Sequence, residues 1–479
     1  MMKKKAEEGK QKAVVGRAAA PAGSEPLPPK TRPRNVGLFL STVLLAVFIR
    51  WLLIAWDFSP WLGSRVEIST PVTGLKRLKE GLALEALNQS PYHGDVYHQA
   101  PLLLPFVKGL LSLEQTLLQH QANDNARPSH LVLLLCFVAV DVLIAILLRN
   151  IAHEHAKRPT FPSLPSVLAF KDSPFSTATT AVTCEEEQEE LKSLFLNQYL
   201  PEFVAMCYLL NPWTIASCVS GSLLLFNNLA VVASLYFAML GNVGLCTFAL
   251  ALATYLSFYP VALLIPLLML LQASVNTKSK GVFLLLWIGS ILFFCVWLGA
   301  LFGLSYLYLQ SWAFFEEVYG FILWAPDLTP NIGLFWYYFT EVFTHFRLFF
   351  TFLFQYHLFL YIPPLAITLR KYPLFLCWLI MALTAILKSY PTVGDTALYL
   401  SILPLFTAVV LENKWSVYVA HVLVFSNVLA PLLWHAWIHQ NTGNANFYYC
   451  LTLLFFMAQG WLVRDSLTSA MQLDVLFTH

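Results

Sequence analysis

The sequence predicts an all-α, polytopic membrane protein with about 12 transmembrane helices. Of its 479 residues, 58% are hydrophobic and only 12% are charged, whereas soluble domains carry roughly 25% charged residues. Apolar runs of roughly twenty residues recur along the chain, which is the length a helix needs to cross a hydrocarbon core of about 30 Å. Helices are favoured over strands because no water at that depth satisfies a free sheet edge.

The predicted spans are the apolar stretches between loops that carry charged, aromatic or turn-forming residues. In chain order they are residues 36–56, 131–148, 203–219, 221–240, 244–259, 260–272, 281–308, 346–369, 372–387, 393–411, 415–437 and 447–463. The stretch 100–118 is also apolar, but Pro101, Pro105 and Lys108 interrupt it. We therefore expect a re-entrant or interfacial helix there.

Basic residues orient the chain, because short loops rich in Lys and Arg stay in the cytosol. Counting twelve spans from a cytosolic N-terminal tail puts five basic loops on the tail's side, at Arg149, Lys157 and Arg158, at Lys278 and Lys280, at Arg370 and Lys371, at Lys414 and at Arg464. Both termini are then cytosolic. The opposite, lumenal side receives residues 57–130, 309–345, the turn 388–392 and the loop 438–446.

These sides lead to a prediction of the domains. The first residues are rich in Lys, Ala, Gly and Pro and lack aromatics, which is typical of disorder. The predicted parts are a disordered basic cytosolic tail at 1–35, a single multispanning membrane domain at 36–464 and a cytosolic tail at 465–479. Within the membrane domain lie the lumenal loop 57–130 with the re-entrant or interfacial helix, the cytosolic insert 152–194 and the lumenal aromatic loop 309–345.

No cofactor, metal or nucleic acid is implied. The net charge is +2, and the basic residues lie mostly at helix ends and in the tail, so no nucleic-acid face is formed. The eight cysteines are scattered without a CxxC pair and are interpreted as buried small hydrophobes. His435 and His439 have the i,i+4 spacing of metal ligands, but no carboxylate or third ligand is near in the sequence. We therefore predict no metal site.

The first large loop carries a family signature. It reads Arg65-Val-Glu-Ile-Ser-Thr-Pro, then Lys76-Arg-Leu-Lys-Glu-Gly and Ser90-Pro-Tyr-His-Gly-Asp. This order resembles the multispanning glycosyltransferases that use dolichol-phosphate sugars, notably the first mannosyltransferase of glycosylphosphatidylinositol (GPI) assembly, and implies a glycosyltransferase-C-like bundle. That family has an Asp-x-Asp pair after its first span, where carboxylates serve as base or hold a metal. Here Glu67-Ile-Ser keeps one carboxylate, so no catalytic residue is predicted.

Later strings point to a narrower family. They are Pro326-Asp-Leu-Thr-Pro-Asn-Ile-Gly-Leu-Phe-Trp, Lys388-Ser-Tyr-Pro-Thr-Val-Gly-Asp, Leu433-Trp-His-Ala-Trp-Ile and Asn444-Ala-Asn-Phe-Tyr-Tyr. In this order, over about 36–464, they resemble the PIG-U family of GPI transamidase subunits. The resemblance implies a non-catalytic, multi-pass subunit in the endoplasmic reticulum membrane that recognises or presents the GPI lipid. It also implies partner subunits, among them a Cys-protease-like catalytic subunit. The alternative function is an active dolichol-phosphate-mannose-dependent mannosyltransferase.

The predicted GPI-binding residues are polar groups at the lumenal ends of the later helices: Asp327, Asn331, Lys388, Asp395, Asn444 and Asn446. Each also has a structural interpretation. Asp327-Leu-Thr-Pro is a turn in an interfacial aromatic belt. Lys388 either forms an intra-loop ion pair with Asp395 or faces a phosphate of the GPI. Asn444 and Asn446 are also suited to capping the following helix.

Other polar groups stay outside this site. Asn88-Gln-Ser matches a glycosylation acceptor, but Pro91 and the nearby membrane argue against its occupancy. Asp141, Asn211-Pro212, Asn227 and Asn228 lie in apolar runs, where polar groups face the bundle interior or a cavity, and structural packing is the favoured interpretation. A transporter is disfavoured, because no inverted repeat or pair of broken helices is recognisable in the sequence.

Overall fold

The computed structural model describes residues 35–118, 131–157, 199–275 and 280–478. Every regular element in these ranges is a helix, which confirms the all-α prediction for this part of the chain. Val36–His479 forms one compact unit. The predicted tail before Asn35, residues 158–194 of the insert and Cys184 lie outside the described residues, so the predictions made for them stay predictions.

Seven helical stretches of the described residues are long and apolar enough to cross a membrane. They are α1 (Val36–Ala55), α5 (Leu131–Lys157), α12 (Lys280–Leu309), α15 (Thr344–Thr368), α17 (Val393–Ile402) joined through η4 (Leu403–Phe406) to α18 (Thr407–Glu412), α19 (Ser416–Trp434) extended by η5 (His435–His439), and α20 (Ala445–Thr478). Shorter apolar stretches are α9 (Leu224–Met239), α10 (Val243–Ser257), η2 (Tyr259–Leu263) continued by α11 (Leu264–Val275), and α16 (Pro373–Leu387). The number of twelve spans therefore stays a prediction.

The predicted span 203–219 is broken in the middle. Residues 199–209 are helical, and α8 (Pro212–Val219) starts a new helix after Asn211. Asn211 caps α8, because its Oδ1 accepts a hydrogen bond from Trp213 N at 2.9 Å. Pro212 fits the first turn because that position needs no N–H donor.

A buried ion pair supports this break. Arg50 of α1 and Asp141 of α5 are both fully buried, with Nη2 and Oδ2 2.5 Å apart. Arg50 Nη1 also donates to the carbonyl of Leu209 at 3.0 Å, just before the break, and Tyr208 Oη donates to Asp141 Oδ1 at 2.8 Å. The interpretation of Asp141 as a packed structural residue agrees with these contacts, which tie three helical segments together.

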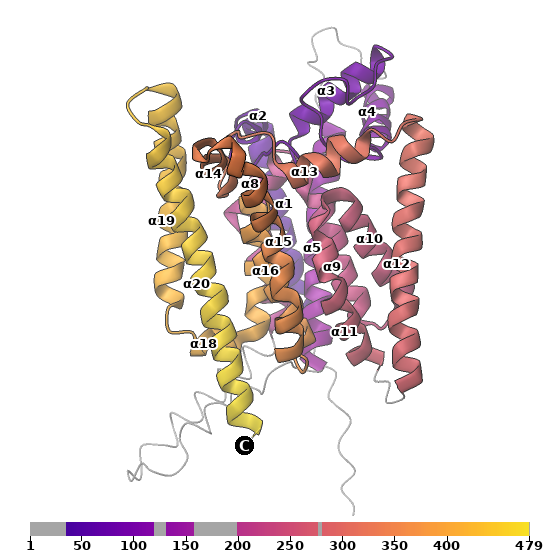
Figure 1. Ribbon diagram of the computed structural model, residues 1–479, viewed down its shortest axis with the longest axis vertical. Coiled ribbons are helices and arrows are strands. Elements are labelled where there is room, and N and C mark those ends of the chain that lie inside the picture. Colours follow the sequence, from indigo (N-terminus) through magenta and orange to yellow (C-terminus); the bar gives the residue numbers. More distant parts are fainter. Residues whose placement is uncertain (1–34, 119–130, 158–198, 276–279, 479) are drawn as a thin grey trace, which may run out of the picture. The chain divides into compact units, whose positions relative to one another are not determined.

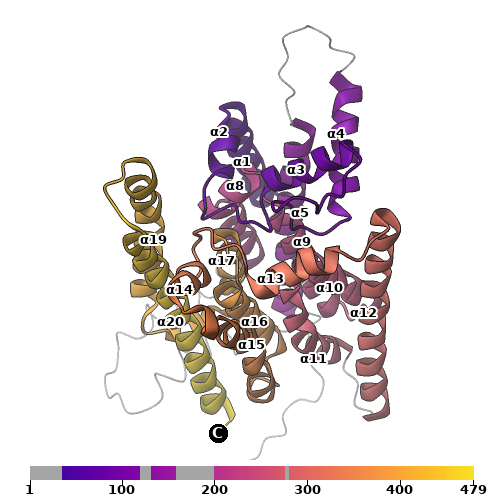
Figure 2. The same ribbon diagram turned by 45° about the horizontal axis from the view of Figure 1, so that its top comes forward.

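The remaining helices gather at one end of the bundle (Figures 1 and 2). They are α2 (Phe58–Gly63), α3 (Leu75–Ala86), α4 (Leu103–Leu118), η3 (Phe315–Gly320), α13 (Phe321–Trp324) and α14 (Phe335–Glu341). The helix α4 occupies the stretch predicted as re-entrant or interfacial, and it packs against α3 and α5. Its depth in the membrane stays a prediction.

The core is densest around α16. Residues 374–382 of this helix are all buried, and Trp378 Nε1 donates to Tyr399 O of α17 at 2.9 Å. By contrast, α12 contacts α10 and α11 and exposes most of its surface. The interpretation of the cysteines as buried is confirmed for Cys218, Cys246 and Cys377. It is wrong for Cys295 and Cys450, which lie on exposed apolar helix faces.

The other end of the bundle collects several of the basic loops. A cavity of about 490 Å³ is lined there by Lys157 at the end of α5 and by Lys371 and Pro373 at the start of α16. Lys371 forms an ion pair with Asp474 of α20 at 2.9 Å, so the predicted C-terminal tail continues the last helix. The assignment of this end to the cytosol stays a prediction.

Candidate functional site

Segments far apart in the sequence meet at the end opposite the basic loops. Val393 N donates to the carbonyl of Glu67 at 3.0 Å, which joins the first loop to the start of α17. Arg77 of α3 forms an ion pair with Asp327 at 3.1 Å, across 250 positions of sequence. Tyr390 Oη donates to the carbonyl of Asp327 at 3.1 Å. The predicted site residues before and after α15 therefore belong to one contact network.

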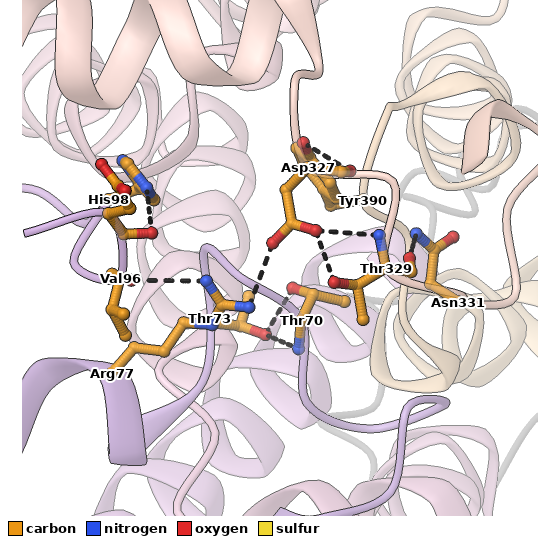
Figure 3. Close-up of polar contacts among 10 residues, drawn as sticks. Thr70, Thr73, Arg77, Val96, His98, Asp327, Thr329, Asn331 and Tyr390 are labelled. Carbon is orange, nitrogen blue, oxygen red and sulfur yellow. Dashed lines mark hydrogen bonds and ion pairs between the residues drawn. The ribbon is translucent and has the colours of Figure 1, made fainter. Parts of the chain in front are cut away.

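Asp327 organises its own turn and reaches across to Arg77 (Figure 3). Its Oδ1 accepts from Thr329 N at 2.8 Å and from the Thr329 hydroxyl, and its Oδ2 accepts from Arg77. Burial, with the Asp327 carboxylate close by, raises the pKa of the neighbouring Tyr390. The phenol therefore stays protonated and donates to the Asp327 carbonyl. The turn interpretation of Asp327 holds, and the ion pair adds a second role.

Asn331 is turned inward. Only 2% of the residue is exposed, its Oδ1 accepts from Gly333 N at 2.7 Å, and its Nδ2 donates to Thr329 O at 3.3 Å. A Cβ on Gly333 would lie 2.7 Å from the ring of Pro391, so only glycine lets the two segments approach this closely. Asn331 thus shapes the loop, and a ligand reaches it only if the loop opens.

Lys388 and Asp395 form the ion pair that the sequence allowed as one alternative. Their side chains are 6% and 11% exposed, and Nζ and Oδ2 are 2.6 Å apart. Asp395 also completes a capping box, since its Oδ2 accepts from Thr392 N at 2.9 Å at the start of α17. Both residues line a small cavity of about 40 Å³ together with Asn227 and Asn228. A cavity of this size holds a few waters beside the ion pair.

Asn444, which directly precedes α20, and Asn446, in the first turn of that helix, are both exposed. Asn444 Oδ1 accepts from Asn446 N at 3.1 Å and from Phe447 N at 3.3 Å, which is the predicted cap of α20. Asn446 Oδ1 accepts from the hydroxyl of Tyr337 in α14. The two asparagines are therefore linked to the aromatic loop, and their outer surfaces stay open to a ligand.

Glu67, at the place of the Asp-x-Asp pair, is buried and held on two sides. Arg65 Nη2 lies 3.0 Å from its Oε1, and Tyr448 Oη of α20 donates to the same oxygen at 3.2 Å. A carboxylate engaged in this way is a poor general base, because its lone pairs already accept hydrogen bonds. Glu67 joins the first loop to α17 and α20.

An apolar groove of about 290 Å³ opens beside this network. Its walls come from α14, α15, α16 and α20, and its lining residues are Leu334, Phe335, Leu353, Phe354, His357, Ile386, Leu387 and Phe456. Phe335 and Phe354 also pack in the cluster that contains buried Tyr390, whose hydroxyl bonds to the Asp327 carbonyl, so this cluster connects the groove to the Asp327 network. One of its lining residues, Leu387, directly precedes Lys388 in the chain.

Sequence reasoning missed Arg65, Arg77 and Tyr448. Arg77 lies in the basic string Lys76-Arg-Leu-Lys, which was part of the family signature. The available signal for an ion pair was a basic residue in this loop together with a carboxylate in another loop on the same side. No group of three or more His, Cys, Asp or Glu able to hold a metal occurs among the described residues. The rings of His435 and His439 lie 5.1 Å apart. The prediction that no metal binds stays untested by this geometry.

Comparisons with known proteins agree with the resemblance. Residues 44–455 match the family described as GPI transamidase subunit PIG-U. The chain is 36% identical over 444 residues to the GPI-anchor transamidase component PIGU of Homo sapiens, covering 91% of this chain and 94% of the relative. It is 32% identical over 405 residues to the GPI transamidase component GAB1 of Saccharomyces cerevisiae, covering 84% and 86%. It is 28% identical over 441 residues to the GAB1 homolog of Schizosaccharomyces pombe, covering 92% and 95%.

Proposed function

Because the chain belongs to the PIG-U family of GPI transamidase subunits, we propose that it holds the GPI lipid substrate for that complex. As a component of the transamidase it takes part in attaching GPI anchors to proteins. Its several apolar helices make it a multi-pass membrane protein, and we place it in the endoplasmic reticulum membrane with the site facing the lumen.

The observation that carries the proposal is the apolar groove of about 290 Å³. Its wall on α15 includes Leu353, which is 46% exposed at the bundle surface, so the groove is accessible from the side of the helix that would face lipid. Ligand sites are typically concave and apolar with a few polar groups that fix orientation. Acyl chains would lie against Phe335 and Phe354, and the glycan would extend over the adjoining loops.

The polar rim supplies groups for the headgroup. Asn444 just before α20 and Asn446 in its first turn present exposed amides, and beyond Tyr390 the Asp327 side chain is 21% exposed and paired with Arg77. Lys388 and Asp395 are already paired with each other, and this ion pair stabilises the turn that follows Leu387 of the groove. The six predicted residues thus divide into exposed groups that suit ligand contact and buried groups that keep the rim in shape.

The same geometry supports a non-catalytic role. Glu67 is the remaining carboxylate at the place of the glycosyltransferase pair, and Arg65 and Tyr448 engage it. Catalytic chemistry would then reside in a partner, the Cys-protease-like subunit, beside the other transamidase subunits. The described relatives are named as transamidase components, and none of those names favours the mannosyltransferase alternative.

The test fills the groove and measures the lipid. Leu353→Trp places a large side chain in the groove without disturbing the core, since Leu353 is half exposed. The tagged complex is purified, and GPI lipids are quantified by mass spectrometry per mole of chain. We expect recovery to fall about tenfold, which corresponds to a loss of about 1.4 kcal/mol of binding free energy.

The matched control is Val424→Trp. Val424 is 62% exposed and lines a separate open apolar groove on α19, so it adds the same ring at an unrelated lipid-facing position. GPI recovery and subunit recovery should both equal those of the parent. Equal GPI recovery from Leu353→Trp and Val424→Trp would place the lipid elsewhere and refute the groove as its site.

A further inference from the structure

Lys388 and Arg77 are two of the cations near the proposed GPI site, and their burial differs. Lys388 is 6% exposed, and its partner Asp395 is 11% exposed, with 2.6 Å between Nζ and Oδ2. Asp395 is in turn fixed by hydrogen bonds to Thr392. The cavity beside the pair measures about 40 Å³. A phosphate therefore reaches Lys388 only by displacing a buried carboxylate that is itself held in place.

Arg77 is the more accessible cation. Its side chain is 24% exposed, and that of Asp327 is 21% exposed, with Nη2 and Oδ2 3.1 Å apart. Nη1 makes a long contact of 3.4 Å with the carbonyl of Val96. These are the contacts of the guanidinium among the described residues, so part of its fork of five donors remains open. In Figure 3 the guanidinium lies between Val96 and Asp327.

The two ion pairs differ in how easily they exchange partners. Removing one partner of a buried pair lowers the folding equilibrium constant by more than about a hundredfold, because the remaining charge is buried without water or a counterion. Breaking a partly exposed pair changes the same equilibrium constant by roughly fivefold or less, since water replaces the lost contact. An incoming phosphate therefore displaces Asp327 from Arg77 at small cost, whereas displacing Asp395 from Lys388 costs far more.

We propose that Arg77 is the cation that binds a phosphate of the GPI lipid, and that Asp327 holds the guanidinium in place until the lipid arrives. The inference rests on the proposed function and names the contact that the sequence had assigned to Lys388. Tyr390 connects the two parts of the site, because it bonds to the Asp327 carbonyl and packs with Phe335 and Phe354 of the groove. Arginine suits this role, since its planar fork binds phosphate with two parallel hydrogen bonds.

The experiment compares Arg77→Gln, Arg77→Lys and Asp327→Asn in the purified complex, with GPI lipid per mole of chain as the readout. Arg77→Gln should lower recovery by about tenfold or more, because a charge-assisted hydrogen bond is lost. Arg77→Lys keeps the charge and loses the fork, and should lower recovery by about threefold. Asp327→Asn removes the competing carboxylate and should raise recovery up to about fivefold.

Asp327→Asn separates binding from structure. If the Arg77–Asp327 pair only ties α3 to the later loop, both substitutions break that tie and lower recovery equally, which would overturn the proposal. If Arg77→Gln prevents assembly, Arg77→Lys and Asp327→Asn still decide by moving recovery in opposite directions. Parental recovery from Arg77→Gln, together with reduced recovery from Leu353→Trp, would reject Arg77 and keep the proposed function. If both Arg77→Gln and Leu353→Trp give the parental GPI recovery, the assignment to Arg77 and the proposed function are both rejected.

Discussion

The buried pair between Arg50 and Asp141 gives a prediction with a large energetic signal. Both side chains have no exposed surface, and each has further partners, Leu209 O for the guanidinium and Tyr208 for the carboxylate. Removing one member leaves the other charge buried without its counterion, which costs about 3–5 kcal/mol. Arg50→Met and Asp141→Leu should each destabilise the protein by that amount.

Replacing both members should cost less than replacing either. The double variant buries no charge, and what remains is an orphaned hydroxyl on Tyr208 and an orphaned carbonyl on Leu209. Each unsatisfied group costs about 1–3 kcal/mol, and the new apolar contacts offset part of that. We therefore expect the double variant to be more stable than both single variants.

The assay is the apparent melting temperature of the detergent-purified protein, followed by the loss of the monodisperse peak after heating. Lys157→Met is the control, because it breaks an ion pair with Glu154 in which Lys157 is 65% exposed, and an exposed pair contributes about 0–1 kcal/mol. Melting temperatures should rank parent and control highest, then the double variant, then the two single variants. A double variant that loses the sum of the two single losses would refute the coupling argument.

Three further predictions concern the loops that connect the helices. Glu67→Gln should leave GPI mannosylation intact, since Arg65 and Tyr448 already occupy the carboxylate; unmannosylated precursor in a lipid extract would contradict this. In a cysteine-free background, a thiol at Gly94 should react with a lumenal reagent and one at Ser279, which lies outside the described residues, should not; labelling at Ser279 would overturn the topology. Gly333→Ala should destabilise the protein by about 1–3 kcal/mol, because its Cβ would meet Pro391 at 2.7 Å; an unchanged melting temperature would show that the loop relaxes freely.

Much of the fold could be predicted because hydropathy reports the solvent of a helix directly. The stretches α1 and α15 are long and apolar, and each falls within a few residues of its prediction, whereas α5 starts where predicted and runs nine residues further, to Lys157. Pro212 indicates a break in the span 203–219 whose freed carbonyls need partners, but the sequence does not show which residue supplies the partner. The partner that stabilises the break, Arg50, lies about 160 residues away, and no local pattern indicates such a contact.

The site was predicted less completely, because sequence shows which groups are polar and does not show which groups they face. Asn444 was placed correctly as a cap, since the helix start that it serves is adjacent. The sequence left two interpretations of Lys388, an ion pair with Asp395 or a contact with a phosphate. The distance of 2.6 Å between Lys388 Nζ and Asp395 Oδ2 shows the ion pair. Arg77 was overlooked because its partner Asp327 is distant in the chain.

The two strings that mark the family most clearly, 326–336 and 388–395, prove to be one structural unit. Gly333 lies against Pro391, Tyr390 bonds to the carbonyl of Asp327, and Asp395 holds Lys388 at the end of α16. Glycine is needed at position 333 because a Cβ there would meet the ring of Pro391 at 2.7 Å, and the capping box of Thr392 and Asp395 fixes the start of α17. The unit also separates the apolar groove from Arg77. A lipid whose chains enter the groove and whose phosphate binds Arg77, as proposed above, would have to pass over this junction.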